Sequence, residues 1–374
     1  MKIAVIGVKG LPASQGGIEH YSEELYSRMI QHGHSVDLYA RSNYTNKPGF
    51  SVYKYKGIRI VSLPSVSILG LDTFLNCFIA TIMATFKGYD IVHIHALGPA
   101  LFCGITRLLS SAKIIVTCHG LDWQRAKWNR LASNIIRLGE KSAVRYAHDI
   151  IVVSQYLQTY FYKTYGLKTN YIPTAPAKYE ATATSLSYSE SLGLATGRYI
   201  LFLGRLVPEK RPDLLIKAFE SLDLAGWKLV LVGELNSTND FKLKLNHISA
   251  NNQNIIFTQA LEGSRLSEIV RGAGLFLMPS DLEGLPLAML EAMREGIPVL
   301  ASDIPPHQQL IGKDRGLLFE AGNLESLRKQ LNKAILNPEQ LIPMAQKAQK
   351  HVERNYNWQK ILTKNLELYG DEKS

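Results

Sequence analysis

The segments Leu275-Phe-Leu-Met278 and Ser280-Asp-Leu-Glu-Gly-Leu-Pro-Leu-Ala-Met-Leu-Glu291 carry the pattern from which the fold can be predicted. The short apolar run predicts a buried parallel strand. Polar residues and Gly284 predict a tight loop. Pro286 predicts the first position of a helix that continues to about Arg294, because proline lacks an N–H that would be unpaired there anyway. Strand, loop and helix N-terminus together present free N–H groups and a positive dipole end to an anion.

Two glutamates flank the predicted anion site, Glu283 in the loop and Glu291 one to two turns into the helix. Carboxylates beside a phosphate would repel it, so these side chains are better suited to accept hydrogen bonds from sugar hydroxyls. The alternative is an ordinary strand-to-helix turn with two solvated glutamates, and this stretch alone supports both interpretations equally.

A second strand-to-helix corner is predicted upstream. An apolar run at 199–203 is followed by Gly204-Arg-Leu-Val-Pro-Glu-Lys-Arg211, and Pro212 begins the next predicted helix. Arg205 and Lys210 therefore stand at a strand end beside a helix N-terminus, where two cations favour phosphate.

The chain begins with a third such corner. A predicted strand at 2–6 leads into Gly7-Val-Lys-Gly-Leu-Pro-Ala-Ser-Gln-Gly-Gly17 and then a helix at about 18–31. A dinucleotide site requires more closely spaced glycines than these, so the nicotinamide interpretation is weak. The pair Gly16 and Gly17 at the helix N-terminus still allows backbone to approach a phosphate closely.

Strands alternating with helices predict an α/β protein with two doubly wound parallel sheets. The predicted domains are 1–180, a linker at 181–198, a second domain at 199–355, and a helix at 356–374 that crosses back to the first domain. The remaining predicted strands lie at 35–40, 58–62, 91–94, 113–117, 150–153, 228–232, 254–257, 299–301 and 316–319.

Composition indicates a globular chain that stays in a reducing compartment. The 374 residues are 46% hydrophobic and 20% charged, with three widely spaced cysteines and no visible secretory signal, so a cytoplasmic location is expected. The apolar stretch 68–86 is interrupted by Asp72 and Asn76, which predicts a buried helix instead of a membrane span.

The net charge of +10 is concentrated in the first half of the chain. Residues 1–185 carry 20 Lys+Arg against 10 Asp+Glu, and the rest carries 22 of each. This asymmetry suggests an anionic membrane surface or nucleic acid as a partner, or a solvated face with none. A predicted helix within 124–145 combines six basic residues with nearby tryptophans, as interfacial helices do. Leu131, Ile135 and Leu138 at helical spacing indicate, alternatively, a core-facing side.

Histidines lie at two predicted strand ends. His95 and His119 occupy positions where ligands of such sheets bind, and His119 is the better site candidate. His93 and His95 share a strand face, but no third metal ligand presents itself, so a structural role is expected for His93. Cys118 and His119 are adjacent and point opposite ways in a strand, which makes a Cys–His nucleophile pair improbable.

These motifs in this order resemble glycosyltransferase family 4, retaining enzymes of the GT-B fold, over nearly the whole chain. The combination of Gly-Arg-Leu-Val-Pro-Glu-Lys210 with Glu283-Gly-Leu-Pro-Leu-Ala-Met-Leu-Glu291 is the specific part. The segments Lys9-Gly-Leu-Pro-Ala-Ser-Gln-Gly-Gly-Ile-Glu19 and His119-Gly-Leu-Asp-Trp-Gln-Arg-Ala-Lys-Trp128 look like a rhamnosyltransferase-like subgroup.

The resemblance implies a site of defined composition. Arg205 and Lys210 would hold the donor diphosphate, and Glu283 would contact the transferred sugar. Glu291 would bind the ribose hydroxyls, and His119 would lie near the donor sugar. The resemblance further implies donor contacts from glycine-rich and helix N-terminal backbone, which are Gly16, Gly17, Gly204, Gly284, Leu285, Pro286, Leu287 and Ala288.

The expected reaction moves a sugar from a nucleotide-diphosphate sugar to a hydroxyl of a glycan or lipid-linked acceptor, without cofactor, in cell-surface polysaccharide or glycolipid assembly. The expected location is the cytoplasm, either free or peripheral on the inner face of the cell membrane. No Asp-x-Asp occurs in the sequence, so no metal is expected, and fixed positive charge would stabilise the leaving group. The leaving phosphate would itself deprotonate the acceptor. Alternatives are a nucleotide-sugar epimerase on the same fold, an NADP-linked reductase, and a non-catalytic basic module; nucleic-acid binding is not expected, since no known motif occurs.

Overall fold

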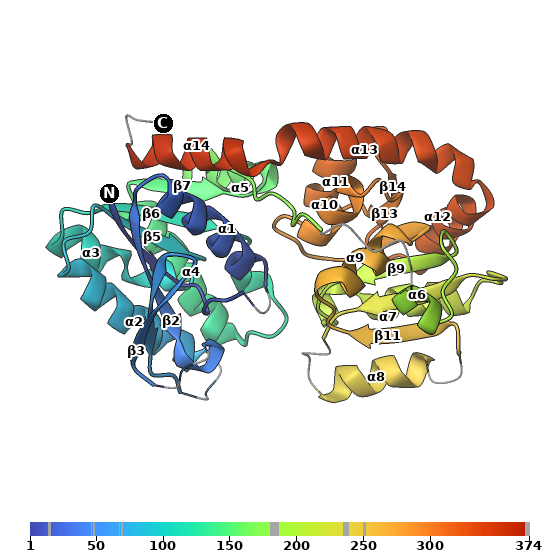
Figure 1. Cartoon of the computed structure of the whole chain (residues 1–374), viewed down its shortest axis with the longest axis horizontal. Coiled ribbons are helices and arrows are strands. Elements are labelled where there is room, and N and C mark those ends of the chain that lie inside the picture. Colours follow the sequence, from blue (N-terminus) through green and yellow to red (C-terminus); the bar gives the residue numbers. More distant parts are fainter. Residues whose placement is uncertain are drawn as a thin grey trace. The chain divides into compact units, whose positions relative to one another are not determined.

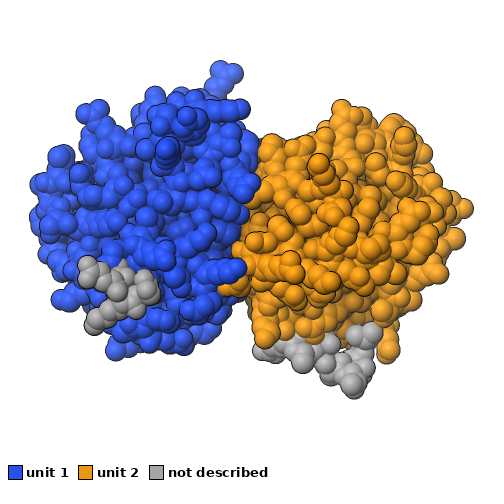
Figure 2. Space-filling model, turned by 90° about the horizontal axis from the view of Figure 1, so that it is seen from above, with its two compact units in different colours: residues 1–175, 358–374 blue, residues 176–357 orange. Residues whose placement is uncertain are grey.

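The computed structural model describes residues 1–13, 16–45, 47, 49–66, 68, 70–179, 187–234, 239–249 and 252–370. The chain divides into two compact units (Figure 2). Unit 1 comprises Met1–Ala175 together with Trp358–Ser374, and unit 2 comprises Pro176–Asn357. The helix expected at the end of the chain therefore belongs to the first unit.

Unit 1 is built on an eight-stranded sheet in the order β3-β4-β2-β1-β5-β6-β7-β8. All neighbours are parallel except β3, which pairs antiparallel with β4. Most residues of the inner strands are buried, with Val and Ile prominent among them, as expected where helices cover both faces. The strands are β1 (Lys2–Ile6), β2 (Ser35–Arg41), β3 (Ser51–Tyr55), β4 (Ile58–Leu63), β5 (Ile91–His95), β6 (Lys113–Cys118), β7 (Asp149–Val152) and β8 (Asn170–Tyr171).

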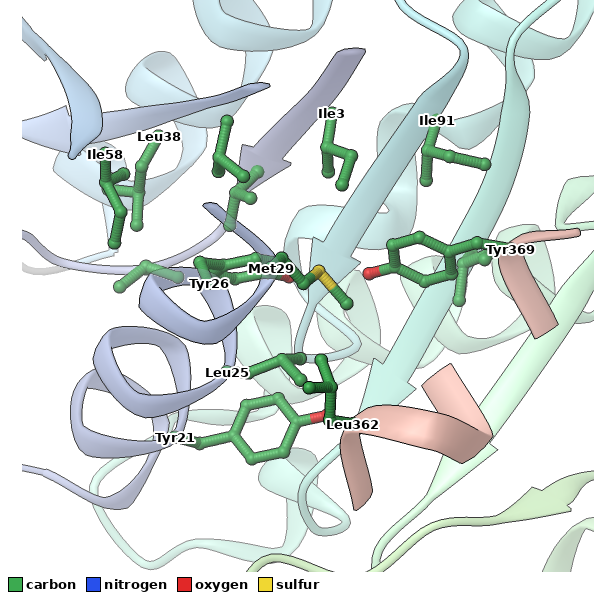
Figure 3. Close-up of a cluster of buried hydrophobic side chains, with 14 of the residues drawn as sticks. Ile3, Tyr21, Leu25, Tyr26, Met29, Leu38, Ile58, Ile91, Leu362 and Tyr369 are labelled. Atoms are coloured by element: carbon green, nitrogen blue, oxygen red, sulfur yellow. The ribbon is translucent and has the colours of Figure 1, made fainter. Parts of the chain in front are cut away.

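The helices of unit 1 include one from the far end of the sequence. Helix α14 packs on α1 (Figure 1), and Leu362 and Tyr369 share a buried cluster with Leu25, Tyr26 and Met29 (Figure 3). The helices are α1 (Gly17–Gln31), η1 (Ser42–Tyr44), α2 (Leu71–Thr85), η2 (Pro99–Phe102), α3 (Cys103–Leu109), η3 (Asp122–Gln124), α4 (Arg130–Tyr146), α5 (Gln155–Tyr165) and α14 (Trp358–Tyr369).

Unit 2 is built on a six-stranded, fully parallel sheet in the order β11-β10-β9-β12-β13-β14. Buried apolar clusters lie against it. The strands are β9 (Tyr199–Leu203), β10 (Lys228–Val232), β11 (Ile255–Gln259), β12 (Leu275–Met278), β13 (Val299–Ser302) and β14 (Leu317–Phe319). The helices are α6 (Ser187–Ser191), η4 (Pro208–Lys210), α7 (Pro212–Glu220), α8 (Asn239–Ser249), α9 (Gly263–Arg271), α10 (Leu287–Arg294), α11 (Pro305–Ile311), α12 (Leu324–Leu336), η5 (Pro338–Gln340) and α13 (Leu341–Asn355).

The region expected to be a linker differs from its prediction. Residues 181–186 lie outside the described residues. From Ser187 onward the chain forms α6 within unit 2, where Ser189 is buried and its backbone N–H and hydroxyl both donate to Glu268 Oε1, at 2.5 and 2.8 Å. The Ser- and Thr-rich composition of this stretch concealed a segment that is fixed by a buried carboxylate.

Two helices present their apolar residues to solvent, contrary to prediction. The stretch 68–86 was expected to be a buried helix, but the large apolar side chains of α2 point outward. Leu131 and Leu138 of α4 were considered core-facing, yet they are 70% and 53% exposed, and the buried side of α4 is formed instead by Ile136, Gly139, Glu140 and Ala143. Among the described residues, none of the helices combines the length and apolar character needed to span a bilayer.

Candidate functional site

The corner predicted in unit 2 is formed by two neighbouring parallel strands. Strands β9 and β12 pair with each other, so their carboxyl ends lie at one edge of the sheet, where ligands of such sheets bind. Lys210 follows β9 in η4 and Glu283 follows β12. The Lys210 Nζ lies 2.7 Å from Glu283 Oε1, and the Ser280 hydroxyl donates to the same oxygen at 2.9 Å. The structure thus brings together the cation and the carboxylate that the sequence placed 73 residues apart.

Glycine backbone makes this corner compact. Gly204 has φ +149°, and a Cβ there would lie 3.4 Å from both Cδ and Nζ of Lys210. The Gly204 carbonyl oxygen would in turn be 1.9 Å from a Cβ at Gly233. Gly204 is favoured by its positive φ, and Gly233 is required by the close approach of this carbonyl oxygen. The end of β9 is therefore backbone without a side chain, with the Lys210 side chain lying over it. Arg205 is the next residue after Gly204.

Glu283 is ionised because of its partner. Burial raises the pKa of its carboxyl, but the charge and hydrogen bond of Lys210 outweigh burial, so the pKa lies below its ordinary value. The side chains of Lys210 and Glu283 are only 16% and 11% exposed. An ionised carboxylate with a remaining acceptor oxygen suits hydrogen bonds from hydroxyl groups, and its low pKa makes it a poor proton acceptor.

Helix α10 begins one residue later than predicted. Pro286 is the capping residue, with φ −78° and ψ 88°, and the helix begins at Leu287. Among the described residues, Pro286 offers this N-terminus no capping hydrogen bond from its side chain, and the first turn contains no acidic residue. The backbone of Gly284, Leu285, Pro286, Leu287 and Ala288 therefore leads into an uncapped helix start, which favours an anion.

Glu291 occupies a different environment from Glu283. Burial raises the pKa of its carboxyl to about 7, although hydrogen bonds from the Tyr179 hydroxyl and the Ala177 backbone lower it. The Tyr179 hydroxyl donates to Glu291 Oε2 at 2.9 Å. Sequence reasoning missed Tyr179 because it lies in the irregular stretch before the second domain, where no periodic pattern marks it.

His307 is a second residue that sequence reasoning missed. It is buried on α11, its Nδ1 lies 3.0 Å from the Ser302 hydroxyl, and the Glu283 charge acts on its ring. Burial lowers its pKa to about 4, so the ring is neutral. Its position shortly after strand β13 could have identified it, because ligands bind beyond the carboxyl ends of parallel strands.

In unit 1, the glycine pair forms the start of α1. Gly16 has φ +103° and is the capping residue, and Gly17 is the first helical residue. A Cβ at Gly16 would lie 2.2 Å from Glu19 Oε2. The Glu19 carboxylate accepts the Lys9 backbone N–H at 3.2 Å, which ties the loop to the helix. A side chain at Gly16 would therefore displace the carboxylate that holds this turn.

His119, which is half-buried, ends a chain of polar rings whose other members are buried. Its Nε2 lies 3.0 Å from His95 Nδ1, and His95 Nε2 lies 2.6 Å from the Tyr26 hydroxyl. The Tyr26 hydroxyl also lies 2.8 Å from His93 Nδ1, which is 2.5 Å from the Tyr369 hydroxyl of α14. His93 thus has the structural role expected of it.

Burial fixes the charge state of these rings. It lowers the pKa of His93 and of His119 to about 3, so both are neutral near pH 7 and act through hydrogen bonds. Cys118 bonds instead to the Gly120 carbonyl, which leaves no Cys–His pair. Among the described residues, no group of three His, Cys, Asp or Glu is arranged to hold a metal ion.

Two family profiles together match most of the chain. The profile described as "Glycosyltransferase Family 4" matches residues 15–175, and "Glycosyl transferases group 1" matches residues 187–351. The chain belongs to glycosyltransferase family 4. It is accordingly a glycosyltransferase, and neither the epimerase nor the non-catalytic module is favoured.

Two relatives match over nearly their full lengths. An uncharacterised glycosyltransferase of Haemophilus influenzae is 26% identical, over 93% of this chain and 95% of that protein. A GDP-mannose-dependent monoacylated alpha-(1-6)-phosphatidylinositol monomannoside mannosyltransferase of Corynebacterium glutamicum is 23% identical, over 93% of this chain and 92% of the relative.

Solved structures confirm the GT-B fold of this family 4 member. Sucrose-phosphate synthase from Thermosynechococcus elongatus superposes with a TM-score of 0.85 at 20% identity and covers 98% of both chains. HepE of Anabaena in complex with UDP-glucose gives a TM-score of 0.80 at 19% identity, over 99% of both chains.

Proposed function

We propose that the protein transfers a sugar from a nucleotide-diphosphate sugar to a hydroxyl of a glycan or lipid-linked acceptor, with retention of configuration and without a divalent metal. The observation that carries the proposal is the Lys210–Glu283 pair over the bare backbone of Gly204, beside the uncapped start of α10. A cation and free N–H groups suit a diphosphate, and an ionised carboxylate suits a sugar.

The names of similar proteins support this donor class. The Corynebacterium glutamicum relative is named as GDP-mannose-dependent, and HepE was solved with UDP-glucose. Base and sugar are therefore best found with a panel that includes UDP, GDP and dTDP, their glucose and mannose derivatives, and dTDP-rhamnose for the rhamnosyltransferase-like subgroup. A specific donor stabilises the fold by mass action, which a thermal-shift assay reports.

The leaving diphosphate is the group whose charge must be stabilised. Lys210 and Arg205 supply fixed positive charge at the end of β9, in the place that paired aspartates with a metal take in other transferases, and the sequence has no Asp-x-Asp. Loss of one such charged donor should reduce turnover about 10² to 10³-fold. Lys210→Met is the variant to test, because methionine keeps the apolar stem over Gly204.

The proton of the acceptor hydroxyl goes to the leaving phosphate oxygen in this proposal. Glu283 is a poor base, since Lys210 holds its pKa low. The pKa of Glu291, about 7, suits a general base, whereas the ribose role assigned to this residue predicts different kinetics. Glu291→Gln should raise KM for the donor with little change in kcat, whereas loss of a base should lower kcat.

Three measurements test the proposal together. Turnover should persist in excess chelator, the anomeric proton of the product should show the donor's configuration by NMR, and Glu283→Ala should lose the extra stabilisation that a sugar nucleotide gives over its diphosphate. Activity that collapses with chelator and returns with magnesium would refute metal independence, and an inverted product would refute retention.

A further inference from the structure

Helix α2 of unit 1 turns its large apolar side chains to solvent and its small and polar side chains to the core, the reverse of an ordinary surface helix. Its outward face carries large apolar side chains at positions i, i+3, i+4, i+7 and i+8, which form one continuous stripe. The exposed residues of this stripe, which we call the α2 stripe, are Leu71 (42%), Phe74 (40%), Leu75 (37%), Phe78 (41%) and Ile79 (40%).

The inward face of α2 is small and polar, and its contacts fix the orientation of the helix. Asp72 forms an ion pair with Arg41 at 3.0 Å, and the Asn76 side chain donates to the Ala40 carbonyl at 3.2 Å. Rotation of the helix to bury the stripe would break both contacts and leave buried polar groups unpaired. The remaining buried residues of this face are Cys77, Ala80, Thr81, Ala84 and Thr85. The exposure of the stripe is therefore built into the fold.

The apolar surface continues onto the neighbouring helix. Phe74 and Phe78 pack their rings on Phe102 of η2, with centroids 5.1 and 5.4 Å apart, and α2 packs against α3. Leu108 and Leu109 at the end of α3 are 76% and 58% exposed. Apolar side chains that gather on one surface in this way mark an interaction site, unlike single exposed ones.

Positive charge borders this surface. Helix α4 packs against both η2 and α3, and its outward face combines Leu131 and Leu138 with basic side chains. The exposed basic residues of α4 are Arg130, Arg137, Lys141 and Arg145. Trp128, two residues before the start of α4, lies beside the N-terminus of α2, because a Cβ at Gly70 would be 3.5 Å from the Trp128 ring.

Each acidic residue of this region is either buried or held by a partner. Residues 71–146 contain nine Lys and Arg against four Asp and Glu. Asp72 pairs with Arg41, Asp122 pairs with Arg125, Glu140 is 1% exposed, and Asp90 accepts the Lys2 backbone N–H at 2.6 Å. The surface around the α2 stripe is therefore apolar in its centre and basic beside it.

We propose that this surface, formed by α2, α3 and α4, docks on an anionic lipid bilayer. The α2 stripe would enter the boundary between headgroups and acyl chains, and the arginines and lysines of α4 would contact lipid phosphates. Interfacial helices bind in this way, by apolar burial plus attraction to anionic headgroups. A second copy of the chain fits less well, because a twofold contact would place the same basic helix opposite itself.

A flotation assay with lipid vesicles tests the proposal. The full chain should float with vesicles containing about one third phosphatidylglycerol in phosphatidylcholine, and less with pure phosphatidylcholine or at high salt. Phe74→Ser with Phe78→Ser should weaken binding roughly ten- to sixtyfold, since each ring is already partly buried. Arg137→Gln with Lys141→Gln should weaken it about fivefold per charge.

Matched controls come from unit 2. Leu336 and Ile342 are 68% and 56% exposed, so Leu336→Ser with Ile342→Ser removes comparable apolar surface and should leave flotation unchanged. For the charges, Lys329→Gln with Lys333→Gln is the matched pair. Quenching of tryptophan fluorescence by brominated acyl chains in the unaltered protein reports insertion without any variant.

Three results would overturn the proposal: no flotation with anionic vesicles, flotation that the α2 substitutions do not reduce, or a dimer in sedimentation that those substitutions dissociate while vesicles bind neither form. The donor contacts tested with the Lys210, Glu283 and Glu291 variants lie in unit 2 and are measured without lipid, so they stand or fail separately from membrane docking.

Discussion

The affinity for a nucleoside diphosphate should depend on pH through Glu291. Burial raises the pKa of this carboxyl to about 7, and the ribose role requires the ionised form, which can accept hydrogen bonds from both ribose hydroxyls. Affinity is then fully present above this pKa and is lost as the pH falls through it. Lowering the pH from 8 to 6 is the perturbation.

The expected size follows from the ionised fraction. One pH unit above the pKa the carboxyl is about nine-tenths ionised, and one unit below it about one-tenth. If only the ionised form binds ribose, the dissociation constant rises about tenfold between pH 8 and pH 6, and binding near pH 7 releases a fraction of a proton.

Isothermal titration calorimetry with the preferred nucleoside diphosphate measures both quantities, the proton release by comparing buffers of different ionisation enthalpy. Glu291→Gln is the matched control, because the amide keeps the shape of the side chain but does not titrate. The variant should bind more weakly, and any remaining pH dependence belongs to the nucleotide phosphates. Equal pH profiles for the two proteins would refute the assignment of ribose binding to an ionised Glu291.

Three further predictions concern stability. Tyr369→Phe removes a hydroxyl from the buried ring chain but leaves His93 its bond to Tyr26, so urea titration should show a loss of about 1 kcal/mol, and an unchanged midpoint would contradict the bond. Gly233→Ala places a Cβ 1.9 Å from the Gly204 carbonyl oxygen at φ +150° and should lower the free energy of unfolding by about 3 kcal/mol or more. The control Gly226→Ala, at φ +75° in open space, should lower it by about 1 kcal/mol. Equal thermal midpoints for the two variants would contradict the close approach. Burial lowers the pKa of His93 from 6.5 to about 3, so the unfolded state binds more protons than the folded state below pH 6.5. The free energy of unfolding should therefore be constant with respect to this group above pH 6.5 and fall by up to about 1.4 kcal/mol per pH unit below it. A His93→Asn variant with the same acid sensitivity would contradict this.

The strands were predictable from sequence because a parallel sheet buries both faces and therefore needs unbroken apolar runs. The predicted strand at 199–203 matches β9, and that at 275–278 matches β12. Strand β3 was missed because Ser51–Tyr55 lies at the sheet edge with partly exposed residues that give no such run. The two-residue β8 gives no periodic signal at all.

Helical spacing predicts which residues share a face, but not which face turns inward. For α2 the usual assumption that apolar residues face the core was wrong, because the polar Asp72 and Asn76 have their partners on strand β2 of the sheet. Leu131 and Leu138 of α4 show the same error, and there the buried side includes Gly139 and Glu140, whose carboxylate accepts hydrogen bonds from Trp123 and Tyr160.

Motifs at strand ends predicted which side chains belong to the site, but they did not predict which residues those side chains contact. Lys210 and Glu283 were assigned separately, and their contact required the pairing of β9 with β12. Tyr179 carries no motif, and its bond to Glu291 spans 112 residues. Such partners follow from tertiary packing, which a single sequence does not record.

The return of α14 to unit 1 makes the core of that unit depend on both ends of the sequence. Leu362, Leu366 and Tyr369 are synthesised only after all of unit 2, an interval on the order of ten seconds at typical rates of translation. During that time the surface of α1 that they cover is open to water. Nascent unit 1 therefore exposes apolar side chains that chaperones recognise, while unit 2, continuous from Pro176 to Asn357, can complete its own core first.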